Sequence, residues 1–249
     1  MKMPVVRGVI DRRILVNFRV DPAVLTELLP KPFRPQVVHG AGMAGVCLIR
    51  LTHVRPWWLP PFAGITSENA AHRIAVEWDG EDGCRRTGVF IPRRDTSSRI
   101  NALAGARLFP GEQHHAKFRV DERHGRYLVA VESDDGHSRL FVEGRRTAEV
   151  PESSVFGSLG EASDFFEQGS VGYSATRRAG CFDGLELRSF AWDVQPLAID
   201  RVESSYFEDQ ALFPRGSVAF DCALLMRGIH HEWHAMDSLR TARYAPVNL

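Results

Sequence analysis

The feature that most constrains this fold is a long succession of short, apolar and β-branched runs. Ile14–Val20 and Ala44–Leu51 are early examples, and Asp200–Phe207 and Val218–Leu225 are late ones. Glycine, proline or acidic turn residues separate the runs, as is typical of strands joined by tight turns. The pattern predicts roughly ten strands, and the last of them is expected to continue through residues 226–233.

Few segments have helical periodicity. Pro22–Leu29 follows a potential N-cap, Asp21, and Ser158–Gln168 begins with a serine that has a glutamate three residues later, a capping pattern. Ser97–Leu108 has a third apolar stripe. Because helices do not alternate with strands, the sequence predicts a β-rich α+β or barrel-like fold rather than a Rossmann fold. Single β domains reach roughly 250 residues, so one domain is expected over residues 1–249.

Composition excludes several function classes. Lys+Arg and Asp+Glu are both 31, and this balance disfavours a nucleic-acid binder. No window is apolar enough to span a membrane, and no signal peptide opens the chain. The four cysteines lack C-x-x-C spacing, so a cytoplasmic protein with free thiols is expected. There is no G-x-G-x-x-G or P-loop motif, and we expect no cofactor.

Proline and tryptophan dominate the segment Val54–Phe62, which has three prolines and two tryptophans. This composition predicts an irregular loop with large apolar anchors. Trp57 and Trp58 are expected to form a lid-like loop over a binding site.

Three histidine or acidic patterns suggest chemistry, each beside a plainer interpretation. His230, Glu232 and His234 share one face of a strand and could bind zinc or iron, or they form an exposed polar face. Glu68, close to the tryptophans, is interpreted either as a carboxyl of raised pKa in an apolar cleft or as a surface ion pair with Arg73.

The strand Gln113–Val120 offers two further candidates. His114 lies on the apolar face of this strand, so we expect its side chain in the core or in a pocket. Lys117 lies on the opposite, basic face, where it would be a Schiff-base amine if it were desolvated, or part of an ordinary solvated face. The chain has only two other lysines, Lys2 and Lys31.

Several motifs in order resemble a known family. They are VNFRVDPAVLTELLPKPF (Val16–Phe33), ITSENAAHRIAV (Ile65–Val76), GEQHHAKF (Gly111–Phe118), ASDFFEQGSVGYS (Ala162–Ser174) and W-x-x-x-P-L from Trp192 to Leu197. Together they resemble the uncharacterised YqjF-like family, which is similar to acetoacetate decarboxylase. The resemblance implies a mostly antiparallel sheet that forms a cone-shaped barrel around a small pocket, with two or three short helices.

The resemblance does not extend to the catalytic amine. The decarboxylases carry a P-K-K segment whose first lysine forms the Schiff base, and here the corresponding position is Gln113 or His114. Lys117 lies three or four residues further on, roughly 10–13 Å along a strand. The resemblance matches Glu68 to an acidic site residue and Arg12 or Arg13 to an arginine, whereas a second family acid has no counterpart in Ala44–Leu51.

We therefore expect a small-molecule pocket without a Schiff-base lysine. An enzyme would use His114 as general base and Glu68 as acid for proton transfer beside a carbonyl or carboxylate. The alternatives are a non-catalytic binding protein, a Lys117 lyase, and a metal enzyme that uses the residues near His230. A homo-oligomer, as in the relatives, is left open. The expected substrate-binding residues are Arg12, Trp57, Trp58, Arg73 and Gln113.

Overall fold

The computed structural model describes residues 4–104 and 111–241, which contain thirteen strands in one mixed sheet. The helices are α1 (Pro22–Leu28), α2 (Arg99–Ala104) and α3 (Leu159–Glu167), with 3-10 turns η1 (Pro61–Ala63) and η3 (Gln168–Ser170). The strands are β1 (Val6–Val20), β2 (Arg34–Pro35), β3 (Val37–Val38), β4 (Ala41–Pro56), β5 (Ile65–Asp79), β6 (Arg85–Thr96), β7 (Gln113–Arg123), β8 (Arg126–Ser133), β9 (Arg139–Arg146), β10 (Val171–Ala175), β11 (Cys181–Ser189), β12 (Gln195–Ser204) and β13 (Val218–Arg240).

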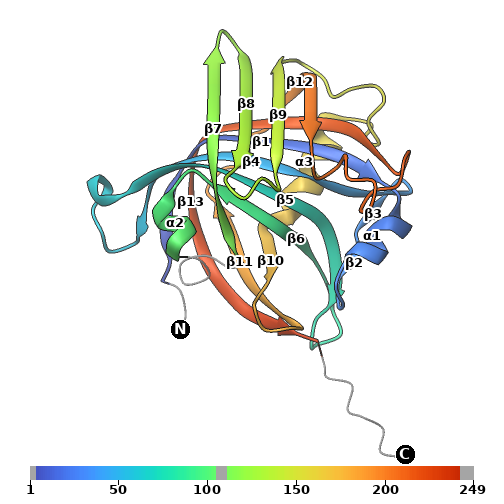
Figure 1. Ribbon diagram of the computed structural model, residues 1–249, viewed down its shortest axis with the longest axis horizontal. Coiled ribbons are helices and arrows are strands. Elements are labelled where there is room, and N and C mark those ends of the chain that lie inside the picture. Colours follow the sequence, from blue (N-terminus) through green and yellow to red (C-terminus); the bar gives the residue numbers. More distant parts are fainter. Residues whose placement is uncertain (1–3, 105–110, 242–249) are drawn as a thin grey trace, which may run out of the picture.

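Seven of these strands close into a ring. Neighbouring strands pair in the order β13, β1, β4, β5, β6, β10 and β11. The ring closes because β11 also pairs with β13. Neighbouring strands run antiparallel except for β10 with β6. Figure 1 shows β5, β6, β10, β11 and β13 curving together toward the bottom of the view. The ring confirms the expected β-rich fold with short helices.

The other long strands form a meander above the ring. β7, β8, β9 and β12 follow one another at the top of Figure 1, and β7 and β12 connect this meander to β6 and β13. The larger apolar core joins this meander to one face of the ring, through residues such as Val16, Val129 and Val142. A second apolar core on the other face includes Leu15 and Ile49 and packs against Phe166 of α3.

Local sequence signals explain where the helices begin. The Asp21 carboxylate accepts a hydrogen bond from the amide of Ala23, and the Ser158 hydroxyl accepts one from Glu161, which satisfies first-turn amides. The prediction of a long final strand is confirmed, since β13 continues to Arg240.

Three predicted segments differ from the structure. The strand expected at Pro35–Val38 is two short strands, because β2 pairs with β5 while β3 pairs with β4. The expected loop Val54–Phe62 is partly regular, since β4 extends to Pro56 and η1 begins at Pro61. Of the helix expected at Ser97–Leu108, α2 accounts for Arg99–Ala104, and residues 105–110 lie outside the described part.

A membrane span requires a helix of sufficient length and hydropathy. Within residues 4–104 and 111–241, none of the helices has the length and apolar character needed to cross a membrane.

Candidate functional site

A small pocket lies within the strand ring. It has a volume of about 80 Å³, and its lining comes from β4, β5, β6, β7, β11, β13 and α2. β4 and β11 lie on different sides of the ring, so a pocket that touches both lies between these sides. Its lining includes apolar side chains, amides and two charged residues: Ile49, Leu51, Asn69, Arg94, Asp95, Gln113 and Leu185.

Strand alternation decides which β5 side chains reach the pocket. Ser67 and Asn69 line it, and successive side chains of a strand point to opposite faces. Glu68 lies between them and points to the other face, where it meets Arg12 and Arg50. The sequence prediction placed Glu68 in the pocket wall, but the structure places its two neighbours there.

Arg94 supplies the positive charge of the pocket. Its Nε donates to the Ser174 hydroxyl at 3.4 Å, and none of the carboxylates in the described residues forms an ion pair with it. Burial lowers the pKa of Arg94 to about 10, so the guanidinium remains charged at neutral pH. Arg94 is partly buried, and arginine is mostly exposed in proteins unless it is paired. This makes Arg94 the clearest sign of a binding site.

Amide side chains add directional polar groups. Asn69 Nδ2 donates to the Ile49 carbonyl at 3.4 Å and to the Ser67 carbonyl at 3.2 Å. Asn101 of α2 is 5 % exposed, and its Oδ1 atom has no hydrogen-bond partner. Buried polar atoms are normally paired, so the unpaired Asn101 oxygen at the pocket wall indicates room for a ligand donor.

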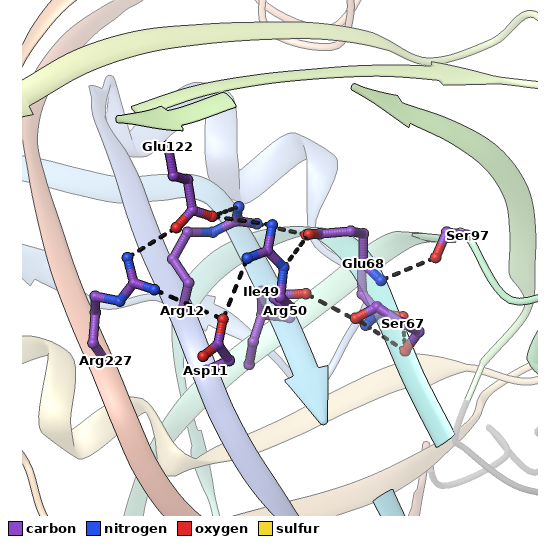
Figure 2. Close-up of polar contacts among 10 residues, drawn as sticks. Asp11, Arg12, Ile49, Arg50, Ser67, Glu68, Ser97, Glu122 and Arg227 are labelled. Carbon is purple, nitrogen blue, oxygen red and sulfur yellow. Dashed lines mark hydrogen bonds and ion pairs between the residues drawn. The ribbon is translucent and has the colours of Figure 1, made fainter. Parts of the chain in front are cut away.

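Arg12 and Glu68, two predicted site residues, lie together in an ion-pair network. Arg12 Nη2 is 2.6 Å from Glu68 Oε2, and Arg12 Nη1 is 2.8 Å from Glu122 Oε1 of β7. Arg50 binds both of these carboxylates and Asp11, while Arg227 binds Glu122 and Asp11 (Figure 2). The Arg12 side chain is fully buried, so this network fastens the meander to the ring on the face opposite the pocket.

The remaining predicted site residues do not all meet in the pocket. Gln113 lines it, whereas His114 Nδ1 lies 3.0 Å from Asp135 Oδ2. Arg73 is buried, donates to Asn17 and lies over the Phe166 ring.

The tryptophans lie in the segment between β4 and η1. Trp57 and Trp58 are each more than half exposed, and neither lines this pocket. A lid role for them remains a prediction.

The metal alternative has little support in the geometry. The Glu232 carboxylate is 2.6 Å from Arg7 Nε and 2.9 Å from His234 Nε2. Across the described ranges, groups of three or more His, Cys, Asp or Glu side chains arranged for a metal ion are absent.

Sequence reasoning missed the most informative residue, Arg94. It lies in Arg93-Arg94-Asp95, where Asp95 pairs with Arg93 at 2.7 Å and not with Arg94. Alternation along β6 separates Arg94 from the other two. This alternation was the available signal, but only the ring shows which face is enclosed.

Fold and site together define a class of protein: a closed ring of strands with a small pocket whose lining includes Arg94 and Asp95. Residues 10–226 match DUF2071, the family described as an uncharacterized conserved protein (COG2071), so the chain belongs to that family. No curated protein matches the chain.

Solved structures share the fold at low sequence identity. Acetoacetate decarboxylase from Legionella pneumophila subsp. pneumophila str. Philadelphia 1 superposes with a TM-score of 0.63 at 9% identity, covering 97% of this chain and 89% of its own. The enduracididine biosynthesis enzyme MppR complexed with pyruvate superposes with a TM-score of 0.60 at 10% identity, covering 98% of this chain and 93% of its own. An acetoacetate decarboxylase-like enzyme from Sphingomonas wittichii RW1 superposes with a TM-score of 0.56 at 12% identity, covering 97% of this chain and 94% of its own. The fold is therefore the acetoacetate decarboxylase-like fold.

Proposed function

We propose that the chain binds a small organic acid with a carbonyl group in the pocket within the strand ring. The observation that carries the proposal is Arg94, a charged pocket residue without a carboxylate partner in the described part of the chain. A ligand carboxylate would supply the missing counter-charge, and guanidinium–carboxylate hydrogen bonds are among the strongest available.

The rest of the pocket wall suits the same ligand. Ile49 and Leu51 provide an apolar surface, while Asn69, Asn101 and Gln113 provide a few hydrogen-bonding groups. Small-molecule sites typically combine an apolar wall with a few convergent polar groups. The amide groups would orient a carbonyl or hydroxyl group while Arg94 holds the carboxylate.

Proteins with this fold are named for chemistry on such compounds. One similar structure is an acetoacetate decarboxylase and another is a biosynthetic enzyme complexed with pyruvate. Their identity to this chain is 9–10%, so they support the ligand class and leave the reaction open.

The positions of the lysines favour binding without an imine. Lys31 and Lys117 are exposed, and neither lines the pocket. Lys117 lies in the solvent-facing part of β7, which argues against the Schiff-base alternative. Lys2 lies outside the described residues.

Catalysis is a second candidate function, favoured by the enzymes among the similar structures. His114 and Glu68 remain its predicted base and acid. Both are engaged elsewhere, His114 with Asp135 and Glu68 with Arg12 and Arg50, so the geometry supports ligand binding more directly than proton transfer by this pair.

Thermal-shift and calorimetric titration with pyruvate and acetoacetate test the proposal. We expect both acids to stabilise the wild-type chain, by about 2.7 kcal/mol at 100 times the dissociation constant. Arg94→Gln should abolish the shift, whereas Lys117→Gln should retain it. No shift in the wild-type chain, or an undiminished shift in Arg94→Gln, would contradict the proposal.

The same samples separate binding from catalysis. NMR time courses of each bound acid should show no turnover if the chain only binds. Turnover that His114→Ala or Glu68→Gln abolishes would establish the enzyme alternative.

A further inference from the structure

Two more arginines point to the same face of the ring as Arg94 and also lack an acidic partner. Arg13 of β1 and Arg73 of β5 are 9 % and 7 % exposed. None of the described carboxylates lies in ion-pair contact with either side chain. A buried charge without a counter-charge is costly, so these residues, like Arg94, need an explanation.

Within the described residues, the three guanidinium groups contact thiol, amide, hydroxyl and aromatic groups rather than carboxylates. Arg13 Nε lies 3.4 Å from Cys47 Sγ, and its guanidinium lies 5.8 Å from the centre of the Trp192 ring. Arg73 donates to the Asn17 side-chain oxygen and lies 5.0 Å from the centre of the Phe166 ring, while its Nε is buried without a partner. Neutral oxygen, sulfur and aromatic groups do not neutralise the three charges.

Strand register brings the three arginines around one thiol. Arg94 pairs with Ala71, and Ala71 pairs with Cys47, so these residues form one row across β6, β5 and β4. The small Ala71 side chain leaves space between Arg94 and Cys47, whose backbones are roughly 10 Å apart at two strand spacings. Arg13 reaches Cys47 from the next strand, and Arg73 lies two residues from Ala71 on the same face.

The pKa values agree with a shared charged environment. Burial lowers the pKa of Arg73 to about 10, and the nearby positive charge of Arg13 acts in the same direction. The pKa of Arg94 is lowered to about 10 by burial as well. Both groups stay protonated at neutral pH, so the interior retains its positive charges.

The opposite face of the same sheet provides an internal comparison. There, Arg12, Arg50 and Arg227 are matched by three acids that contact them: Asp11, Glu68 and Glu122. The fold thus supplies equal counter-charge where arginines of the ring meet Glu122 of β7. Among residues 4–104 and 111–241, no acid forms an ion pair with the three interior arginines, although Glu167 and Glu186 line the same pocket as Arg13. A ligand could therefore supply counter-charge that the described side chains do not.

We propose that the interior of the ring binds an organic acid with two carboxylates, one at Arg94 and the second toward Arg13 and Arg73. This inference rests on the proposed function and extends it from one acidic group to two. Arg13 lines a larger pocket of about 550 Å³ between α3 and β11. Leu185 lines the first pocket, and the adjacent Glu186 and Leu187 line the second, so the two spaces are neighbours along β11.

Calorimetric titration with two acids of equal chain length tests the inference. The pair is 2-oxopentanoate, with one carboxylate, and 2-oxoglutarate, with two. We expect the diacid to bind the wild-type chain at least about tenfold more tightly, because each further charge-assisted contact adds affinity. Arg13→Gln should reduce the diacid affinity to that of the monoacid without changing monoacid binding. Arg94→Gln should weaken both.

The control variant is Arg119→Gln, an exposed arginine of β7, which should leave both affinities unchanged. Equal wild-type affinities for the two acids, or an Arg13→Gln variant that keeps the diacid preference, would overturn the inference while leaving the proposed function intact. Failure of both acids to bind would overturn the two proposals together. The wild-type comparison decides the question even if the Arg13 variant does not fold.

Discussion

Arg12 and Glu68 form a buried ion pair, with Nη2 and Oε2 2.6 Å apart, on the face of the sheet that points away from the pocket. The Arg12 side chain is fully buried, and Glu68 also binds Arg50 at 2.5 Å. Removing one partner of such a pair leaves an uncompensated buried charge. This pair therefore links β1 to β5 within the ring, and its loss should affect stability more than ligand binding.

Glu68→Gln tests this structural role. We expect the free energy of unfolding, measured by urea denaturation, to fall by about 3 kcal/mol. The dissociation constant of a pocket ligand should change little. Glu203→Gln, which removes an exposed pair with Arg201, should have almost no effect. A stable Glu68→Gln variant that has lost binding would instead place Glu68 in the functional site.

Arg94→Met should stabilise the ligand-free chain, because it removes a desolvated charge that has no acidic partner among the described residues. Functional sites commonly cost stability in this way. We expect the melting temperature of the variant to rise by about 2–4 °C, which corresponds to roughly 1 kcal/mol for a chain of this size. Ligand binding should be lost.

Arg50→Met is the matched comparison for Arg94→Met. Arg50 contacts Glu68 and Glu122 at 2.5 and 3.1 Å, so its removal should lower the melting temperature. A lower melting temperature in both variants would contradict the assignment of Arg94 as an unpaired charge.

His231 should make the protein sensitive to acid. Burial lowers its pKa to about 4. The unfolded chain, with a histidine pKa near ~6.5, binds more protons than the folded chain between these values. Stability is therefore complete above pH ~6.5 and declines as the pH falls toward 4, by at most about 1.4 kcal/mol per pH unit from this group.

His231→Phe should flatten this dependence and keep the ring packing against Trp233, whose centre is 4.5 Å away. Urea denaturation at pH 7.5, 6 and 5 measures the slope. His72 has a pKa lowered to about 3 by burial and should supply a residual slope in the variant. The exposed His137→Gln serves as control, and equal slopes in wild-type and His231→Phe chains would refute the assignment.

Borohydride reduction in the presence of pyruvate should leave the mass of the chain unchanged. An imine requires an amine at the carbonyl carbon, and Lys31 and Lys117 are exposed and lie outside the pocket lining. Intact mass spectrometry followed by peptide mapping detects any adduct. A stoichiometric adduct on Lys117 that is absent from Lys117→Gln would restore the Schiff-base alternative.

Much of the fold could be predicted because its signals are local. Strand runs, the Asp21 and Ser158 caps and the continuation of β13 depend on neighbouring residues. The division of Pro35–Val38 between β2 and β3 could not be predicted, since its two parts pair with different strands.

The site was harder to predict because it depends on which face of each strand the ring encloses. Strand alternation places the side chains of Glu68 and Asn69 on opposite faces of β5. The strands β10 and β11 close the ring on the Asn69 face, so Asn69 points to the interior. Arg94 is distinguished by the lack of an acidic partner in the described structure, and the absence of a contact cannot be predicted from sequence alone. Gln113 lines the pocket, and its role in binding stays a prediction.

A crystal structure of the chain with pyruvate tests the central claim most directly. We predict ligand density inside the ring, with carboxylate oxygens roughly 3 Å from the Arg94 guanidinium and the carbonyl facing the amides of Asn69 or Gln113. Pyruvate bound elsewhere with Arg94 facing a protein carboxylate, or a ring interior filled by side chains, would contradict the account.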